Sequence, residues 1–557
     1  MRATVGVNRG IPHANTHAVP GRHCRGVVTD VPAGRQPPAA HDRHGAVPGL
    51  HDLLPGHGVD RERDHHVAPA PPPSQAGRTP AGHGTGGSRG RAGPPAAAAP
   101  RPSRPARWRS RVILVFGHRV DLILVLAVVL VAVSVLYGLF ILVLSRFEPR
   151  SCQDRRVRVA TLEDHLKVVF VVPCLNEERV LGASLQRLAG LDHPGVEIIV
   201  IDDGSDDGTA EIVRSFPDPR VHLFQRTLPH AREGKGEALN AAIQHLRTSD
   251  LIAGTSHSDV VVCVMDADGR LDPHALQDVM PLFRDRRLGA VQIGVRINNR
   301  AQNLLARMQD LEFVLYTHVF QRGRRHLGSV GLGGNGQFVR LSALNGLGVS
   351  PWSRSLTEDL DLGVRLLMDG WQTEFVSTAS VHQQGLADVK RWVKQRTRWF
   401  QGHLQSWSLV PWVLRDLSGA RRADLVYHLT SPFLLLLTSF LSLAFAFWVL
   451  DLAVGIVTGH AVVSGWWLSS YLIAFGPALL YGLVYWSQER HSGLSALAAV
   501  GLIHLYVLYA VLWYVAGWKA AWRAVRGKNG WAKTERTVEN QEQVDASADA
   551  LTAEAHA

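Results

Sequence analysis

The chain has few cysteines, and they are isolated from one another. The four are Cys24, Cys152, Cys174 and Cys263. Their spacing contains no pair, which excludes a disulfide framework and a zinc site built on closely spaced cysteines. Cys174 and Cys263 fall in predicted strands, where cysteine typically acts as a small buried residue. A reducing, cytosolic setting is therefore expected for the segment that holds them.

Four long segments contain no Asp, Glu, Lys or Arg: Leu122–Ser145, Leu425–Leu450, Trp466–Ser487 and Gly493–Trp518. Each is long enough to span a bilayer, and the first starts too late and is too long for a cleavable signal sequence. Several tryptophans lie near their ends, as is typical of the membrane–water interface. We expect a transmembrane helix at 120–146 and about three more at 425–518, in preference to buried core helices.

The side of the membrane that holds the C-terminus stays open. One span before a cytosolic domain and three after it would put both chain ends outside. Yet the C-terminal tail at 519–557 begins with a basic segment, which predicts a cytosolic location. The rest of this tail is polar. A re-entrant turn near Pro432, or a second short span within Leu425–Val457, would remove the conflict.

The first 110 residues lack lysine and any periodic apolar pattern. They contain 15 arginines and six acidic residues and are rich in Pro, Gly, Ala and His, a composition typical of disorder. Most of the net charge of +11 therefore belongs to this tail. A basic arm could bind nucleic acid or anionic lipid. Alternatively, the start is over-extended and translation begins at a non-AUG codon, for example at Val112 or Val120.

Asp266-Ala267-Asp268 follows the apolar run Val260–Met265. The run predicts a buried parallel strand, so the two carboxylates emerge at its carboxyl end, where open α/β sheets bind ligands. Two neighbouring carboxylates repel each other unless a cation lies between them. Mg²⁺ or Mn²⁺, together with a phosphate, suits such oxygen ligands, although a turn or a helix cap is the simpler explanation for the motif alone.

Two further strands and a helix complete βαβ units. Val168–Val172 and Glu197–Ile201 are predicted strands, and Leu181–Leu191 has helical spacing, with Asn176-Glu177-Glu178 opening that helix. Asp202–Thr209 places more acids at a strand end, either as ligand-binding groups or as an Asx-capped turn. Lys235 lies between Gly234 and Gly236, where it could approach a phosphate or remain a solvated loop lysine.

Two motifs lie farther along. Gly331–Gly336 reads Gly-Leu-Gly-Gly-Asn-Gly, a backbone able to lie flat on a ligand, but it lacks the lysine and spacing of a P-loop. Thr357-Glu358-Asp359 precedes an amphipathic helix. Thr357 could simply be its N-cap, whereas an aspartate at that position could also act as a general base.

Gln395-Arg396-Thr397-Arg398-Trp399 lies in a segment rich in Arg, Lys and Trp. Such a segment is typical of an interfacial helix whose cations reach toward water. Alternatively, Arg398 could neutralise a leaving phosphate and Trp399 could stack on a sugar ring.

Taken in order, these motifs resemble the processive family 2 inverting glycosyltransferases, which include cellulose, hyaluronan, chitin-oligosaccharide and poly-N-acetylglucosamine synthases. The resemblance covers Val168–Trp399 and the flanking spans. It implies an α/β GT-A domain at 165–390, with a mostly parallel sheet flanked by helices, and interfacial helices at 391–420, joined to the helical transmembrane region. It also implies a nucleotide-sugar donor, usually linked to UDP.

The resemblance assigns a role to nine residues. Asp359 would be the catalytic base. Asp203, Lys235, Asp266 and Arg398 would bind the donor, and Asp268 would be the direct ligand of a Mg²⁺ or Mn²⁺ ion. Glu358, Gln395 and Trp399 would bind the acceptor. In that scheme the acceptor hydroxyl attacks the anomeric carbon from the face opposite the nucleotide, so a second carboxylate nucleophile is not needed.

The leading hypothesis is a plasma-membrane enzyme with a cytosolic catalytic domain that elongates a β-linked polysaccharide. The alternative is a single-addition transferase acting on a membrane lipid such as diacylglycerol, which Gly333–Gln337 and Thr357–Leu362 resemble at least as closely. A non-catalytic scaffold is disfavoured by the complete set of acids. The expected partners are the nucleotide sugar, a glycan or lipid acceptor and the bilayer; binding of nucleic acid is not expected.

Overall fold

The computed structural model describes residues 112–115, 118–148, 166–460 and 466–528. All of them lie in one of the two units into which the chain divides, Arg104–Ala557. The tail predicted at 1–110, the end of the tail predicted at 519–557, Cys24 and Cys152 lie outside the described residues. A short antiparallel pair, β1 (Val112–Val115) and β2 (His118–Asp121), precedes the first long helix.

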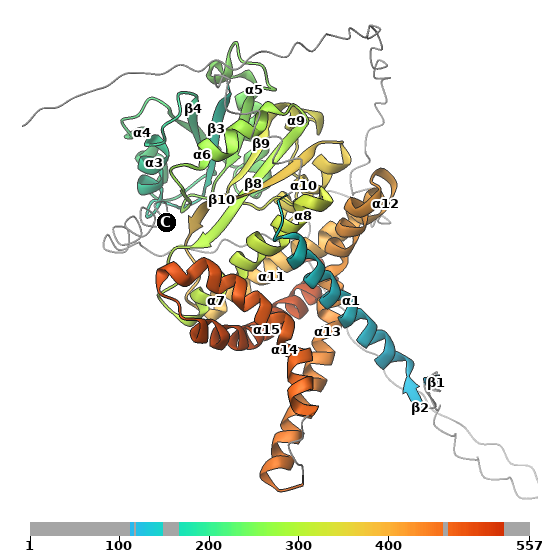
Figure 1. The fold of residues 1–557 in the computed structure, drawn as a ribbon. Coiled ribbons are helices and arrows are strands. Elements are labelled where there is room, and N and C mark those ends of the chain that lie inside the picture. The colour runs from blue at the N-terminus through green and yellow to red at the C-terminus, as the bar shows by residue number, and fades with distance from the viewer. Residues whose placement is uncertain (1–111, 116–117, 149–165, 461–465, 529–557) are drawn as a thin grey trace, which may run out of the picture. The chain divides into compact units, whose positions relative to one another are not determined.

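A mixed sheet organises the region between the apolar helices. Its strands are β3 (Lys167–Cys174), β4 (Val196–Asp202), β5 (Val221–Gln225), β6 (Val260–Val264), β7 (Arg270–Leu271), β8 (Leu288–Ile297), β9 (Gln337–Arg340) and β10 (Gln372–Gln383). They lie in the order β5-β4-β3-β6-β9-β8-β10-β7 (Figure 1). Strands β5, β4, β3 and β6 are parallel to one another, and β8 is parallel to β10. Strand β9 is antiparallel to both of its neighbours, β6 and β8, and β7 is antiparallel to β10. The predicted α/β class and its strands are confirmed.

Alternation along β3 shows how the sheet is buried on both faces. Val168, Phe170 and Val172 pack on one face with α3 (Leu181–Ala189), α4 (Thr209–Arg214) and α6 (Ala275–Val279). Val169 and Val171 pack on the other with α5 (Lys235–Thr248), α9 (Leu341–Gly346) and α10 (Glu358–Met368). Burial of each such side chain contributes about 1.5–3 kcal/mol, which is why the strands are continuous apolar runs.

The segment after β3 corrects one prediction. Asn176 has a positive φ of 56°, so Asn176-Glu177-Glu178 forms a turn and the helix opens only at Leu181. The turn is tied to the next strand–helix loop, because the Asn176 carboxamide accepts from Asp206 N at 2.8 Å and Glu178 Oε2 accepts from Gly208 N at 2.9 Å. These loops meet at the carboxyl edge of the sheet, beside Asp203.

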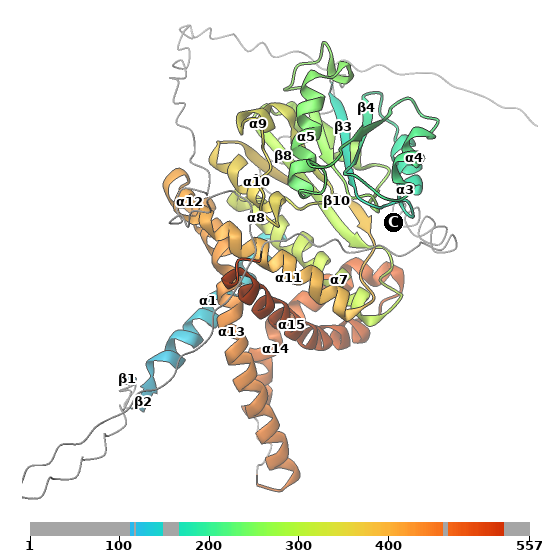
Figure 2. The same ribbon diagram turned by 180° about the vertical axis from the view of Figure 1, so that it is seen from behind.

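Helices of the C-terminal half pack beneath this edge. α7 (Leu304–Leu315), a π-helical turn (Tyr316–Gln321) and α8 (Arg322–Leu327) form one continuous rod. α11 (Val389–Ser406) follows β10 and lies beside α15 (Ala496–Val525), as Figure 2 shows. The short helix α12 (Val410–Asp416) then connects α11 to the apolar helices.

The four uncharged segments all form helices: α1 (Leu122–Leu144), α13 (Gly419–Val457), α14 (Trp466–Glu489) and α15. Among the described residues, α13 and α15 are long and apolar enough to cross a membrane by length and composition. Two such helices are weak evidence that the chain associates with a membrane.

α13 continues through Pro432, so the turn considered at that position is absent. Proline cannot donate the hydrogen bond that the carbonyl of residue i−4 would accept. That carbonyl belongs to His428, and it accepts instead from Ser431 Oγ at 2.7 Å and lies 3.0 Å from His403 Nε2 of α11. The helix is continuous because neighbouring side chains satisfy the freed carbonyl.

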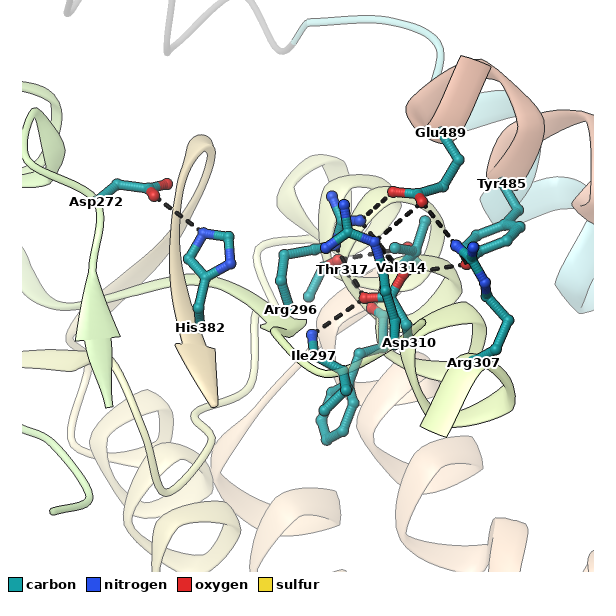
Figure 3. Close-up of polar contacts among 12 residues, drawn as sticks. Asp272, Arg296, Ile297, Arg307, Asp310, Val314, Thr317, His382, Tyr485 and Glu489 are labelled. Atoms are coloured by element: carbon teal, nitrogen blue, oxygen red, sulfur yellow. Dashed lines mark hydrogen bonds and ion pairs between the residues drawn. The ribbon is translucent and has the colours of Figure 1, made fainter. Parts of the chain in front are cut away.

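A buried ion cluster joins α14 to the sheet (Figure 3). Glu489, at the end of α14, is fully buried and pairs with Arg307 of α7 at 2.9 Å and with Arg300 at 3.0 Å. Arg296 of β8 contacts Glu489 and lies 3.1 Å from Asp310 of α7. Removing one partner of such a cluster leaves a buried charge, so the contact fixes α14 against α7.

Candidate active site

One cavity of about 840 Å³ lies at the carboxyl edge of the sheet and extends between the C-terminal helices. All nine residues with predicted roles line it, although they come from five separate parts of the chain. They are Asp203, Lys235, Asp266, Asp268, Glu358, Asp359, Gln395, Arg398 and Trp399. The roles assigned to them remain predictions, while the shared location is an observation.

Lys235 and Asp266 form an ion pair at the centre of the cavity. Asp266 follows β6, and Lys235 is the first residue of α5, so it is neither a loop residue nor a solvated lysine. Lys235 Nζ lies 2.6 Å from Asp266 Oδ1 and donates to the Gly334 carbonyl at 2.7 Å. Burial opposes the charge, but Asp266, Glu358 and Asp359 outweigh it and raise the pKa of Lys235. The ammonium therefore stays protonated, as a phosphate-binding group must.

Asp268 is 5% exposed and is held by the residue that follows β10. Its Oδ2 accepts from the backbone N of Gln384 at 3.2 Å. Asn335 braces the same corner, since its Oδ1 accepts from Asp266 N at 3.2 Å and its Nδ2 donates to Gln383 Oε1 at 3.0 Å. The Asp-x-Asp motif does form a turn, because Gly269 N donates to the Asp266 carbonyl at 2.9 Å, and Asn335 and Gln384 hold this turn from other parts of the chain.

These residues fit a divalent ion. Among the described residues, there is no group of three or more His, Cys, Asp or Glu side chains that would enclose a metal. Mg²⁺ usually takes only one or two carboxylates and completes its shell with water and substrate phosphates. Asp268 and Asp266 supply two carboxylates, and the ammonium of Lys235 balances part of their negative charge.

Asp203 lies at the end of the cavity nearest β4. Its carboxylate is 2.5 Å from Arg226 Nη1, and both side chains are buried. Burial raises the pKa of Asp203, although Arg226 opposes this rise. The predicted Asx turn is also present beside it, because Asp202 Oδ1 accepts from Ser205 N at 2.9 Å.

The glycine-rich loop lies flat across the carboxylates. Gln292 of β8 holds it at two points: Oε1 accepts from Gly333 N at 2.8 Å, and Nε2 donates to the Asn335 carbonyl at 2.9 Å. A Cβ at Gly334 would lie 3.2 Å from Asp359 Oδ2 and 3.3 Å from Lys235 Nζ. The absence of a side chain therefore lets the loop touch both charged groups.

We expect Gly334→Ala to reduce turnover about tenfold, because displacing reacting groups by tenths of an ångström to one ångström costs up to about a hundredfold. Gly333→Ala is the matched control, since its Cβ would make an ordinary 3.7 Å contact with Gln292 Oε1. Steady-state turnover and thermal unfolding of both variants provide the measurement. Equal losses of turnover in the two variants would contradict the steric argument.

Glu358 and Asp359 open α10. Thr357 occupies the N-cap position, but its side chain makes no capping bond, and among the described residues its buried Oγ1 has no hydrogen-bond partner. Thr357 therefore occupies the predicted N-cap position, but the prediction that its side chain caps the helix is wrong. Gly402 of α11 lies against Thr357, since a Cβ there would come within 2.6 Å of Thr357 N and 2.7 Å of its Oγ1. α11 thus packs directly on the turn that presents the two acids.

Burial sets the protonation of this acidic pair. Burial and the neighbouring Asp359 raise the pKa of Glu358 to about 7, while Lys235 and Arg398 oppose the rise. Burial also raises the pKa of Asp359, and Lys235 again opposes it. Two carboxyl groups this close titrate as a pair.

If Asp359 must be ionised to accept a proton, the rate should rise with pH through the raised pKa of Asp359. We expect Glu358→Gln to leave this rise in place, because the charge on Asp359 raises the pKa of Glu358, so Glu358 is still protonated where Asp359 ionises. The pH profile of kcat/KM for both proteins is the measurement. A rise that moves to lower pH in Glu358→Gln would show that Glu358 ionises first.

α11 presents Gln395, Arg398 and Trp399 to the cavity. Arg398 lies close enough to Glu358 to lower its pKa. One face of Trp399 is covered by the guanidinium of Arg396, whose central carbon is 4.0 Å from the ring centroid. Only the remaining surface of Trp399 is open to a ligand.

A comparison with known families decides the class of this domain. Residues 165–402 match the model described as "Glycosyltransferase like family 2". These residues, called the glycosyltransferase domain below, are therefore similar to family 2 glycosyltransferases. Its mixed sheet with flanking helices agrees with the α/β class expected from the sequence.

Curated relatives of the glycosyltransferase domain differ in what they make. The beta-monoglucosyldiacylglycerol synthase of Trichormus variabilis is 32% identical over 48% of this chain and 56% of its own length. The poly-beta-1,6-N-acetyl-D-glucosamine synthase of Staphylococcus epidermidis is 28% identical over 42% of this chain and 54% of its own length. The chain thus spans little more than half the length of each relative.

A solved structure with a similar chain course is the mannosyltransferase PcManGT from Pyrobaculum calidifontis, in complex with GDP-Man and Mn²⁺. It is 18% identical, with a TM-score of 0.43, and the match covers 73% of this chain and 100% of that one.

Several residues that support the cavity of the glycosyltransferase domain were not found from the sequence. Arg226 holds Asp203 and Gln292 holds the glycine-rich loop, yet each reaches its partner from a separate part of the chain, so spacing carries no signal. The aromatic lining from α7 and the π-helical turn after it, such as Phe313 and Tyr316, looks in sequence like ordinary helix core.

Proposed function

We propose that this chain is a membrane-bound, inverting hexosyltransferase that uses a nucleotide diphosphate sugar, most simply a UDP-sugar. Its acceptor would be held between the glycosyltransferase domain and the C-terminal helices. The observation that carries the proposal is the single cavity, which reaches from Asp203 past Asp359 to Ser431, Tyr481 and Tyr514 of α13, α14 and α15. The catalytic domain would be cytosolic, since nucleotide sugars are made there.

In this proposal the chemistry is a single displacement. Asp359 takes the proton of the acceptor hydroxyl, whose oxygen forms a bond to the anomeric carbon from the face opposite the nucleotide. The bond from that carbon to the phosphate oxygen breaks, and its electron pair leaves with the diphosphate. Lys235 and Arg398 stabilise the charge that develops there.

Asp268, with Asp266, would hold Mg²⁺ or Mn²⁺, and such an ion supplies further stabilisation of the leaving diphosphate when bound. Asp203, fixed by Arg226, lines the cavity and would contact the nucleoside. Trp399 and Gln395 would contact the acceptor, together with Glu358.

The acceptor half of the cavity favours a lipid. Its lining includes Phe313, Phe320, Phe400, Leu435 and Trp513, and apolar surface of this kind favours acyl chains over a hydrated glycan. The relation to beta-monoglucosyldiacylglycerol synthase supports the same choice. We therefore propose a lipid hydroxyl, of the diacylglycerol class, as the acceptor.

A polysaccharide acceptor, favoured by the sequence motifs, is the second candidate. Aromatic rings at Trp399 and Tyr316 line the cavity and offer stacking surfaces to sugars, and the poly-beta-1,6-N-acetyl-D-glucosamine synthase supports this alternative.

Product size separates the two. Full-length protein in lipid nanodiscs would receive Mg²⁺ or Mn²⁺ and radiolabelled UDP-glucose or UDP-N-acetylglucosamine, with and without diacylglycerol. A labelled lipid carrying one sugar, formed only with diacylglycerol, supports the first candidate, and a labelled polymer supports the second. Failure to release nucleotide from any donor would contradict the transferase proposal itself.

A further inference from the structure

The two arginines of the Gln-x-x-Arg-Trp segment have different positions in the structure. Arg398 lines the cavity. Arg396 does not line it and is fully buried, at 0% exposure, between α7, α11 and α15. A side chain that cannot reach a ligand can still act on the reaction through its neighbours.

Aromatic rings enclose the Arg396 guanidinium. Its central carbon lies 4.0 Å from the ring centroid of Trp399, 5.3 Å from that of Trp513, 5.4 Å from that of Trp392 and 5.7 Å from that of Phe313. A desolvated guanidinium is strongly attracted to such ring faces. The Trp399 contact is the closest of the four.

Polar contacts fix the orientation of the guanidinium plane. Nη2 lies 3.2 Å from Glu312 Oε2 of α7, and Nη1 donates to Gln395 Oε1 at 3.3 Å. Glu312 is in turn contacted by Tyr509 of α15. Among the described residues, the buried Nε has no hydrogen-bond partner. The guanidinium of Arg396 is therefore surrounded largely by aromatic rings.

Five neighbours of Arg396 are themselves part of the cavity wall: Trp399, Gln395, Phe313, Trp513 and Glu312. We propose that Arg396 is a positioning residue that fixes Trp399 and Gln395 for the acceptor. The inference rests on the proposed transferase function, and it assigns Arg396 a role distinct from that of Arg398, which lines the cavity and is proposed to bind the donor.

Arg396→Lys tests this role. Lysine keeps the positive charge for Glu312 but lacks the planar group that stacks on a ring. We expect the acceptor KM to rise on the order of a hundredfold, as for a displacement of about 1 Å, while nucleotide affinity and donor hydrolysis without acceptor stay unchanged. Arg415→Lys is the matched control, since Arg415 also stacks on a tryptophan, Trp412, at 4.2 Å but lies outside the cavity.

A spectroscopic readout makes the test independent of turnover. In protein labelled with 5-fluorotryptophan, the ¹⁹F resonance lost in Trp399→Phe identifies Trp399. It should shift or broaden in Arg396→Lys and remain in place in Arg415→Lys. Should Arg396→Lys fail to fold, Glu312→Gln, which removes the charge that orients Arg396, is expected to change both readouts in the same direction.

An unchanged Trp399 resonance overturns the proposal, whatever the kinetics. So does an unchanged acceptor KM, or an equal loss of nucleotide and acceptor binding, because a purely structural arginine would affect both. If the wild-type protein transfers no sugar to any acceptor, the proposed function fails, while the ¹⁹F resonance still decides whether Arg396 positions Trp399.

Discussion

Asp359→Asn should lower sugar transfer by about 10²–10⁴-fold, the usual contribution of a general base, while nucleotide binding is retained. Asparagine has the same shape and can still accept from Leu360 N, as Asp359 Oδ1 does at 2.8 Å. It cannot take a proton from the acceptor. Because the change also removes a negative charge beside Lys235, nucleotide affinity should stay equal or become slightly tighter.

Transfer would be followed with labelled donor and acceptor, and nucleotide affinity by calorimetry on the same preparations. Asp369→Asn, at the other end of α10 and exposed, is the control that should behave as wild type. An equal loss of transfer and nucleotide binding in Asp359→Asn would argue for a structural aspartate.

Asp268→Asn should weaken binding of Mn²⁺ in the presence of UDP, and with it transfer, by at least about a hundredfold. Loss of groups that only support a metal ligand costs about 10–100-fold, so loss of the charged ligand itself should cost no less. The variant keeps an oxygen that can accept from Gln384 N, as Asp268 does at 3.2 Å, so the local backbone should be preserved.

Electron paramagnetic resonance of Mn²⁺ gives the metal affinity without relying on activity. Asp278→Asn is the control, because Asp278 lies on α6 outside the cavity and accepts from Thr378 Oγ1. If Asp268→Asn binds Mn²⁺ as tightly as the wild-type protein, the ion is held elsewhere and the assignment of Asp268 is wrong.

Strand and helix positions were readable because the core is patterned locally. Val260–Met265 and Val168–Val172 are apolar runs of strand length, and burial on both faces of a parallel sheet requires such runs. The four uncharged segments were predicted as helices for a similar reason, since their length excludes short strands. The turn at Asn176 was missed because its positive φ depends on hydrogen bonds to a different loop.

The acids of the site were found because carboxylates after buried strands, or before an amphipathic helix, stand out against their surroundings. Their partners could not be found in that way. Arg226 reaches Asp203 and Gln292 reaches the Gly333 loop only once the strands have paired. In the sequence, Arg396 cannot be distinguished from the other basic residues of its segment. Its position becomes special only when α7, α11 and α15 enclose it.

Local pattern was therefore enough for the α/β sheet, the apolar helices and the identity of the acidic groups, because burial and backbone geometry act on neighbouring residues. The contents of the cavity wall, the pairing of Lys235 with Asp266 and the aromatic enclosure of Arg396 required the folded chain. Each depends on side chains from distant segments meeting within a few ångströms, and short-range contacts of that kind are set by packing rather than by spacing along the chain.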